Sequence, residues 1–283
     1  MYSLTVKNAK GEQLQLTQNP DYVITNIDGL HPPDAIINMM ERAGHDGTLF
    51  NSAKVDYRQI ILNIAINSDA CQNRNNLYRF FQTARPVRLI YNNDLRGVYI
   101  DGYVQNAPIG FFEPKQNIQI TIICPDPFWH GLTDVEGVTD GVESLFEFPF
   151  SIEEGNPIPF SEYDSSNAAY IWNPGSVESG LLIEIRATGS VSNPLIYHVN
   201  TDTFFKVNTS LQNGDRLQIC TKVDDKYVRR IRSGSTTNLI AYRAIGSSWL
   251  TADPGMNQFT LKATSGVSNM TATIKFTTNI EGV

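Results

Sequence analysis

The chain has 283 residues and a formal net charge of −7, from 22 Lys and Arg against 29 Asp and Glu. Charged residues make up 18% of the sequence, below the about 25% that is typical of soluble domains. Proteins bind nucleic-acid phosphates through clustered Lys and Arg, so this acidic chain is poorly suited to nucleic-acid binding. Hydrophobic residues make up 41% and are spread along the chain, which excludes intrinsic disorder and predicts one or two globular domains.

Signals for export, membrane insertion and disulfides are weak. Residues 1–7 lack the basic start and apolar stretch of a secretory signal. The most apolar short stretch, residues 60–66, is far shorter than the ~20 residues of a membrane helix, so we expect no membrane insertion. Cys71, Cys124 and Cys220 are odd in number and widely separated, which matches neither a disulfide framework nor a zinc site. These features favour synthesis in a cytosol.

The first half of the sequence has a dominant period of two, the pattern of strands with one solvated face. Apolar residues alternate with polar ones over 98–105 and 117–122, and the stretch 55–66 looks longer and more buried. Residues 92–94 read Asn-Asn-Asp, which favours a hairpin turn between two strands. We therefore predict an N-terminal domain over residues 1–130, an antiparallel sheet or sandwich.

One segment, about residues 69–84, follows a helical period instead. Its apolar residues fall at i, i+3, i+4 and i+7 and are Leu77, Phe80, Phe81 and Ala84. Ser68 or Asp69 can cap the first turn, and Pro86 ends the helix because the residue before a proline avoids the helical conformation. We predict a helix that packs these four side chains on the sheet.

A second segment, residues 34–42, is ambiguous. It contains Ile36, Ile37, Met39 and Met40, a spacing that fits a helix or a buried strand about equally well.

The end of the first domain is marked by the motif Cys124, Pro125, Asp126, Pro127, Phe128, Trp129. Two prolines so close together cannot lie inside a central strand. We place the domain boundary near residues 130–138. The following stretch, residues 131–167, is acidic and rich in turns, with one apolar island at 145–150 that we predict to be an edge strand.

The second half contains many short alternating stretches separated by turn signals, for example at 183–187, 216–219 and 259–263. This pattern is typical of a β-sandwich or jelly roll. The sequence predicts no further helix of useful length after Ala84. We therefore predict a mainly β chain whose second domain, residues 131–283, is a β-sandwich.

Motifs for catalysis and metal binding are absent from the sequence. It has no nucleophile elbow, no phosphate-binding glycine loop and no H-E-x-x-H, and its four histidines lack metal-ligand spacing. The adjacent carboxylates Glu153 and Glu154, and Asp224 and Asp225, could serve a glycoside hydrolase only from loops, since neighbouring strand residues face opposite ways. We expect no enzyme, no catalytic residue, no cofactor and no metal.

Three aromatic residues of the second half allow two interpretations. Tyr170, Trp172 and Trp249 could form a platform for sugar rings. The favoured interpretation is that Tyr170 and Trp172, two residues apart on one strand, fill one face of the core. Trp172 and Trp249 remain candidate sugar contacts.

Several short motifs, spread over nearly the whole chain, carry a family resemblance. In the first domain they are GLHPP at 29–33, DGTLFNS at 46–52, LYRFF at 77–81, VYIDGYV at 98–104 and the more specific CPDPFW at 124–129. In the second they are NPG at 173–175, SNPLI at 192–196, NGD at 213–215 and PGMN at 254–257. Together they resemble the distal tail proteins of siphovirus-type phages that infect Gram-positive bacteria. Pro174 departs from the family pattern, which tends to lead into Gly-Asp here.

This resemblance implies a structural hub rather than an enzyme. Family members form a ring, commonly of six copies, at the distal end of the virion tail. Their N-terminal domain is a sheet carrying one helix, and their C-terminal domain is a galectin-like jelly-roll β-sandwich. The ring joins the tail tube protein, the tape-measure protein and the tail-tip, tail-associated or receptor-binding proteins of the baseplate. It leaves a channel through which DNA passes, and its copies are made in the host bacterial cytoplasm.

Two hypotheses follow for a ring of this chain. Long alternating strands offer edges that can meet those of the next copy, so we expect the first domain to provide the ring contacts. A ring of acidic chains repels DNA from its wall, so we expect carboxylates to face the lumen. The alternative function is a carbohydrate-binding module that contacts the host cell wall, and a third is a glycoside hydrolase.

Overall fold

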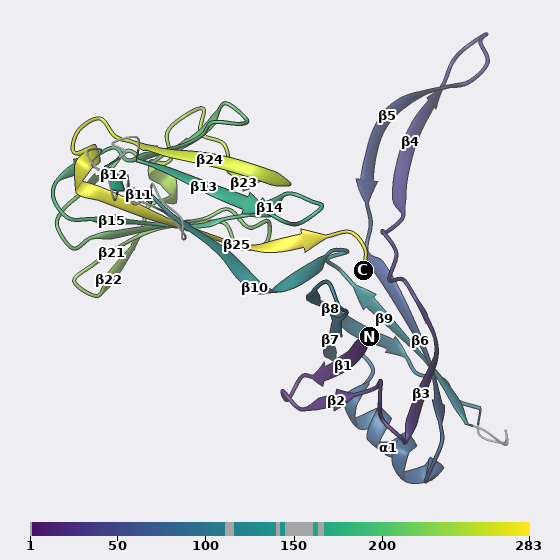
Figure 1. Ribbon diagram of the computed structural model, residues 1–283. Coiled ribbons are helices and arrows are strands. Elements are labelled where there is room, and N and C mark those ends of the chain that lie inside the picture. Colours follow the sequence, from purple (N-terminus) through teal and green to yellow (C-terminus); the bar gives the residue numbers. More distant parts are fainter. Residues whose placement is uncertain (1, 111–115, 140–141, 145–160, 164–166) are drawn as a thin grey trace, which may run out of the picture. The chain divides into compact units, whose positions relative to one another are not determined.

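The computed structural model describes residues 2–110, 116–139, 142–144, 161–163 and 167–283. In this part the chain is mainly β, as predicted, with one α-helix and two short 3-10 turns (Figure 1). It divides into two compact units: residues 1–132 together with 279–283 form the first, and residues 133–278 form the second. The second unit is therefore inserted into the sequence of the first.

The first unit contains one antiparallel sheet with the strand order β2-β1-β7-β8-β9-β6-β3. Its strands are β1 (Ser3–Asn8), β2 (Gln13–Gln15), β3 (Tyr22–Asp28), β6 (Arg58–Ile66), β7 (Pro86–Asn92), β8 (Gly97–Asn106) and β9 (Asn117–Cys124). The start of β10 (Trp129–Val138) pairs with β8. On β6, Ile60, Leu62 and Ile64 are fully buried, so the period of two in the sequence marks the core face.

The helix α1 (Ala70–Phe80) is shorter than the predicted 69–84. Leu77, Phe80 and Phe81 are buried in the first unit's core beside residues of the sheet. Ala84 lies outside the helix, is exposed and has a left-handed φ of 60°, so its predicted place on the apolar stripe is wrong. Its N–H instead donates to the carbonyl of Val104 on β8, 2.8 Å away, because the chain has already turned toward the sheet.

The predicted side-chain cap of α1 is also wrong. Asp69 takes the N-cap position in a left-handed conformation, and its side chain makes no capping hydrogen bond. The Asn73 amide reaches back instead and donates to the carbonyl of Ser68 at 2.8 Å.

The ambiguous segment at 34–42 is a strand. β4 (Ala35–Glu41) pairs only with β5 (Thr48–Val55) among the described strands, and the two form a hairpin that is exposed along its whole length. The alternative of a helix is therefore wrong, and so is burial of this strand.

The second unit is a β-sandwich of two antiparallel sheets. One sheet contains β25 (Met270–Ile280), β15 (Leu182–Ala187), β20 (Arg216–Cys220), β21 (Tyr227–Arg232) and β22 (Ser235–Asn238) in that order. The other contains β13 (Ala168–Asn173), β24 (Gly255–Lys262), β17 (Leu195–His198) and β18 (Thr203–Lys206). Ile183 and Phe276 from the first sheet share one core with Phe259 from the second. The galectin-like topology stays a prediction.

Short strand pairs and turns complete the second unit. They are β11 (Val142–Ser144) with β12 (Ser161–Tyr163), β14 (Ser179–Gly180) with β23 (Thr251–Ala252), β16 (Val191–Ser192) with β19 (Ser210–Leu211), and the 3-10 turns η1 (Ile240–Tyr242) and η2 (Val267–Asn269). The predicted edge strand at 145–150 and the pair Glu153 and Glu154 lie outside the described residues. Asp224 and Asp225 are exposed in the loop between β20 and β21.

All three cysteines are free thiols. Cys124 is fully buried, and this burial raises the pKa of its thiol to about 12. Burial also raises the pKa of Cys220. Both thiols are therefore protonated and unreactive near neutral pH. Among the described residues, no cluster of three or more His, Cys, Asp or Glu is placed to hold a metal ion, and no helix is long and apolar enough to cross a membrane.

Candidate assembly site

The hairpin of β4 and β5, which we call the arm, has one entirely apolar face along most of its length. Three directly opposed pairs form this face: Ala35 with Val55, Ile37 with Ala53, and Met39 with Phe50. Opposed residues share a face and alternate residues along a strand return to it, so the six side chains lie together. A bulge after Asn38 keeps this alignment by adding one residue to β5.

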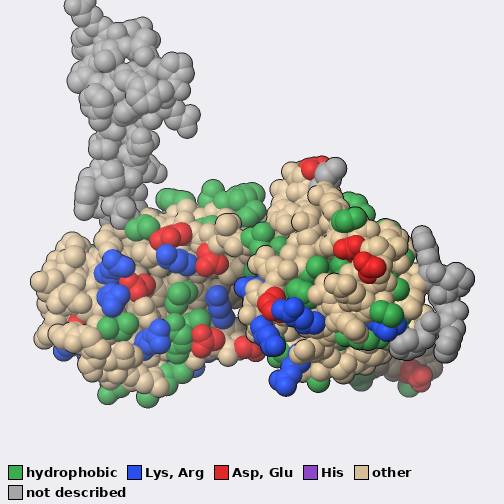
Figure 2. All heavy atoms as spheres, turned by 90° about the horizontal axis from the view of Figure 1, so that it is seen from below, with side chains coloured by type: hydrophobic (Ala, Val, Ile, Leu, Met, Phe, Trp, Pro, Cys, Tyr) green, Lys and Arg blue, Asp and Glu red, His purple; other side chains and the backbone are tan. Residues whose placement is uncertain are grey.

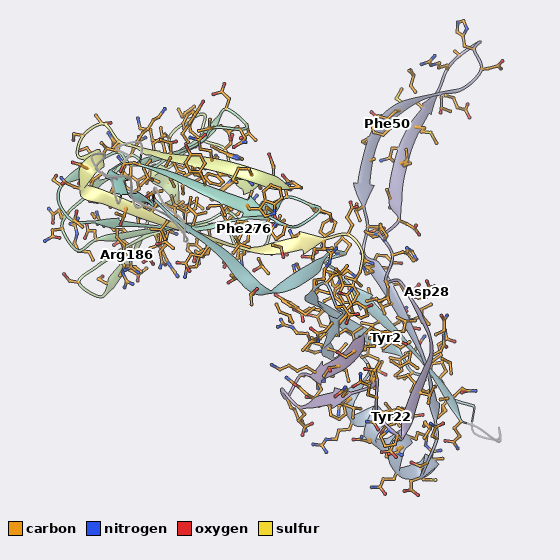
Figure 3. All side chains as sticks on the ribbon, in the orientation of Figure 1. Tyr2, Tyr22, Asp28, Phe50, Arg186 and Phe276 are labelled. Carbon is orange, nitrogen blue, oxygen red and sulfur yellow. The ribbon has the colours of Figure 1, made fainter. Side chains whose placement is uncertain are left out.

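Solvent reaches this face in the isolated chain. Phe50 is 68% exposed and Met39 is 60% exposed, and Ile37 is also more than half exposed. Figure 3 shows Phe50 on the arm, far along the hairpin from Asp28 at its base. A two-stranded hairpin is marginally stable in water by itself, and an apolar face of this kind is the mark of an interaction surface.

The opposite face of the arm is mixed. Met40 and Leu49 are exposed there near the tip, but Asn38 donates to the Ser52 hydroxyl at 3.0 Å and Lys54 opposes Ile36. The two faces of the arm therefore differ, and the face of the three apolar pairs is the candidate for a contact with another protein.

A buried guanidinium holds the base of the arm. Arg58 opens β6, is 3% exposed, and donates hydrogen bonds to four backbone carbonyls. Nη1 reaches the carbonyls of Gly29 and His31 at 2.6 Å each, Nε reaches that of Pro127 at 2.6 Å, and Nη2 reaches that of Glu281. We call this group the Arg58 clamp. It ties the strand that follows the arm, β6, to the segment that precedes the arm, to the domain-exit motif and to Glu281.

The last residues of the chain are anchored to the first unit by further contacts. Ile280 is buried in its core, and the Val283 N–H donates to the carbonyl of Leu30 at 3.1 Å. The side chains of His130 and Asn279 are hydrogen-bonded at 3.1 Å. The chain thus leaves the first unit soon after His130 and returns to it at Asn279, and these two residues are in contact.

The structure at the clamp explains why the motif GLHPP begins with glycine. Gly29 has a φ of +88°, and a Cβ there would lie 2.2 Å from the carbonyl oxygen of Gln59. Only glycine fits this approach, which brings the carbonyl of Gly29 onto Arg58. Beside the clamp lies a cleft of about 340 Å³, whose lining includes Asp28, Asp34 and Asp56.

The domain-exit motif surrounds the clamp from the other side. Cys124 and Trp129 are fully buried, whereas Pro125 is exposed and Phe128 is partly buried. Asp126 accepts a bond from the Phe128 N–H at 3.1 Å and pairs with His130 at 3.4 Å. Burial raises the pKa of Asp126, but the bonds from His130 and Phe128 outweigh it and hold this pKa below its usual value. The motif therefore shapes the turn that presents the Pro127 carbonyl to Arg58.

The two candidate sugar contacts are not brought together. Trp172 is 59% exposed and Tyr170 is 55% exposed on the solvent face of β13, so the interpretation that they fill the core is wrong. The aliphatic residues that alternate with them on β13, Ala169 and Ile171, are the ones buried. Trp249 is partly buried and packs on the core residue Phe205, with ring centroids 5.0 Å apart.

Sequence reasoning missed both the arm and the clamp. Apolar residues on either side of a turn containing Gly44 and Gly47 were a usable hairpin signal. Arg58, next to a strongly apolar strand, was a weaker signal for a buried charge, because its four acceptors are backbone atoms with no signature in the sequence.

Two family profiles match the chain. "Phage tail protein RIFT-related domain" matches residues 9–124, which include the arm and the clamp arginine. "Siphovirus-type tail component, C-terminal domain" matches residues 174–279, most of the second unit. The chain belongs to the phage distal tail protein family.

Solved structures have the same fold as this distal tail protein. SPP1 Dit, described as a paradigm of the hub adsorption apparatus in Gram-positive infecting phages, aligns with a TM-score of 0.68 at 15% identity, covering 99% of each chain. A chain of the phage P2 baseplate in its activated conformation aligns with a TM-score of 0.56 at 12% identity, covering 100% of each chain, in the Ca structure and equally in the Sr structure. A search of curated protein sequences finds no match.

The two family profiles make the distal tail protein a structural component of a siphovirus-type phage tail, within the virion. The family is a structural component and not an enzyme family, so the glycoside hydrolase hypothesis is set aside.

Proposed function

We propose that six copies of this chain close into a ring at the distal end of the phage tail. The ring joins the tail tube protein and the tape-measure protein to the tail-tip, tail-associated or receptor-binding proteins that contact the host. Its job is to connect these parts and to leave a channel for DNA. The copies are made in the bacterial cytoplasm before assembly into the virion.

The observation that carries this proposal is the apolar face of the arm. Burying the side chains of Ile37, Met39 and Phe50 would stabilise a contact by about 1.5–3 kcal/mol for each fully buried side chain. In this proposal the next copy of the chain packs on this face. A ring needs a contact between two different surfaces of the same protein, and an arm that reaches a neighbour supplies one of them.

Whether such contacts close depends on the rotation that each contact makes between copies. A contact between two different surfaces generates a ring where the rotation closes, and a filament where it does not. The arm also has unpaired outer edges on β4 and β5 among the described strands, and coverage by a neighbour protects them from non-specific pairing. The first unit, which holds the arm and the clamp, therefore provides the ring contacts in this proposal.

The negative net charge of the chain favours passage of DNA through the channel of the ring over binding of DNA to its wall. The chain carries a net charge of −7, and in the view of Figure 2 its Lys and Arg are interspersed with Asp and Glu. A ring of such chains has a repulsive field for a polyanion. We expect carboxylates to line the lumen, and a lumen lined by Lys and Arg would contradict this part of the proposal.

The insertion of the second unit gives a direct test of where the ring contacts lie. Residues 133–278 are replaced by a short Gly-Ser linker that joins Leu132 to Asn279, which keeps Ile280 and the Glu281 carbonyl in place. We expect this variant to remain oligomeric in multi-angle light scattering. A folded variant, verified by circular dichroism, that is monomeric at every concentration would contradict the proposal.

A matched truncation separates folding from assembly. A chain ending at residue 130 loses the same second unit but also loses Ile280, which is buried in the first unit's core. We expect its thermal midpoint to fall below that of the linker variant, because a buried side chain and one acceptor of the Arg58 clamp are removed.

A further inference from the structure

The four-stranded sheet of the second unit has an aromatic solvent face. Register places Trp172 opposite Met256 and Tyr170 opposite Gln258, and Tyr197 opposite Thr260 on the next strand pair. Opposed residues share a face, and Met256, Gln258 and Thr260 alternate along β24, so all six side chains lie on one side of the sheet. We call them the aromatic strip.

Two rings of the strip, Tyr170 and Trp172, are open to solvent and the third, Tyr197, is partly buried, although aliphatic side chains fill the core beneath them. Ala169 and Ile171 are buried while their neighbours Tyr170 and Trp172 face outward. Next to Trp172 stands Gly255, whose φ of +94° favours glycine and which adds no side chain beside the indole. A rigid sheet thus holds flat apolar rings at the surface, where no contact in the described part of the chain explains them.

Polar groups are interleaved with the rings. Gln258 donates to the Tyr170 hydroxyl at 3.1 Å, and the Tyr197 hydroxyl donates to Asp202 at 2.5 Å. Aromatic rings beside fixed hydroxyl, amide and carboxylate groups offer a ligand both apolar contact area and hydrogen-bonding partners. The core of a protein–protein interface, by contrast, is depleted in charged groups.

One end of the strip is cationic. Leu195 on β17 pairs with Lys262 on β24 and with Lys206 on β18, so the two lysines flank one position of the same face. The Lys262 ammonium also lies 4.4 Å from the Tyr197 ring centroid. From Met256 to Lys262 the strip covers seven residues of one strand, about 20 Å at the rise of an antiparallel strand.

We propose that the aromatic strip binds a saccharide chain that carries anionic groups. The C–H faces of its pyranose rings pack on Trp172 and Tyr170, and its hydroxyl groups exchange hydrogen bonds with Gln258 and Asp202. Its phosphate or carboxylate lies between Lys206 and Lys262, since an ammonium is a compact point charge suited to such groups. A polynucleotide, with a phosphate on every unit, would need more cations along the strip than these two.

The test uses the full chain on an array of hexopyranose oligosaccharides in three sets: neutral, uronic-acid-bearing and phosphate-bearing. We expect binding to at least one anionic set, and the set that binds identifies the anionic group. In titration of the bound probe, Trp172→Ala should weaken binding at least tenfold, and Lys262→Gln should weaken it while leaving the weak binding of a neutral analogue unchanged. Because Trp172 is exposed, the thermal midpoint and oligomeric mass of Trp172→Ala should stay those of the parent chain.

Trp249→Phe is the matched control, since it changes the other tryptophan of the second unit, whose ring packs on the core residue Phe205 and is not part of the strip, and it should bind as the parent does. Three results would overturn the proposal: no binding to any set, equal binding by Trp172→Ala, or tighter binding of a single-stranded oligodeoxynucleotide that is lost in the same variants. None of them bears on the ring, whose contacts are assigned to the first unit.

Discussion

Replacement of Arg58 by alanine is expected to destabilise the first unit by roughly 3–5 kcal/mol. The change removes a side chain that is almost fully buried and leaves four backbone carbonyls, from three separate segments, without their donor. A buried acceptor without a partner costs about 1–3 kcal/mol, although water entering the gap satisfies some of them. Arg58→Lys should lose less, because it keeps the charge but cannot reach all four carbonyls.

The three tryptophans allow a clean measurement of this loss. Trp129 is fully buried in the first unit, so in a Trp172→Phe, Trp249→Phe background its fluorescence reports urea unfolding of that unit alone. Arg88→Ala is the control: it removes an arginine of the same unit whose exposed pair with Asp101 should contribute about 1 kcal/mol or less. An Arg58→Ala chain within 1 kcal/mol of its parent would show that the clamp does not hold the base of the arm.

Polar substitution on the apolar face of the arm is expected to make the ring dissociate into monomers. In the double variant Met39→Ser, Phe50→Ser, one opposed pair loses its apolar side chains, which are exposed in the isolated chain. The lost burial amounts to about 3–6 kcal/mol for each contact between copies, or more than a hundredfold in its dissociation constant. Analytical ultracentrifugation should show a shift from ring to monomer, with an unchanged thermal midpoint for the monomer's own fold.

The neighbouring apolar pair, one position nearer the tip, provides the control. Met40 and Leu49 oppose each other on the mixed face, beside Asn38 and Ser52. Met40→Ser, Leu49→Ser should therefore weaken assembly much less. Equal effects of the two double variants would mean that burial of the apolar face is not what holds the copies together.

Local patterns predicted the strands and the helix because both leave a period in the sequence. The buried residues of β6 repeat every second position, and Leu77, Phe80 and Phe81 mark the inner side of α1. Ala84 extended that stripe by its spacing alone, but the helix ends at Phe80, and Ala84 has a left-handed φ of 60° in the turn that follows.

Periodicity says which residues share a face but not which face is inside. Tyr170 and Trp172 share one side of β13 and Ala169 and Ile171 the other, and the larger, more aromatic set is the one in solvent. The core between the two sheets of the second unit is filled from both sides, so small aliphatic residues suffice at this position. Only the packed structure resolves that choice.

The arm and the clamp lie beyond local reasoning for a different reason. The apolar residues of β4 stand in adjacent pairs, Ile36 with Ile37 and Met39 with Met40, and such pairs suit a helix or a strand. In the proposed ring, their exposure is explained by a contact with the next copy, which no local pattern in one chain reveals. Arg58 meets acceptors as distant in sequence as Glu281, a contact that depends on the whole fold.

Electron microscopy of the purified full chain over a range of concentrations tests the central claim most directly. We expect closed annular particles with sixfold symmetry, in which the arm of each copy lies against the next and the central channel stays open. Particles that remain single at every concentration, with or without the neighbouring tail proteins, would contradict it.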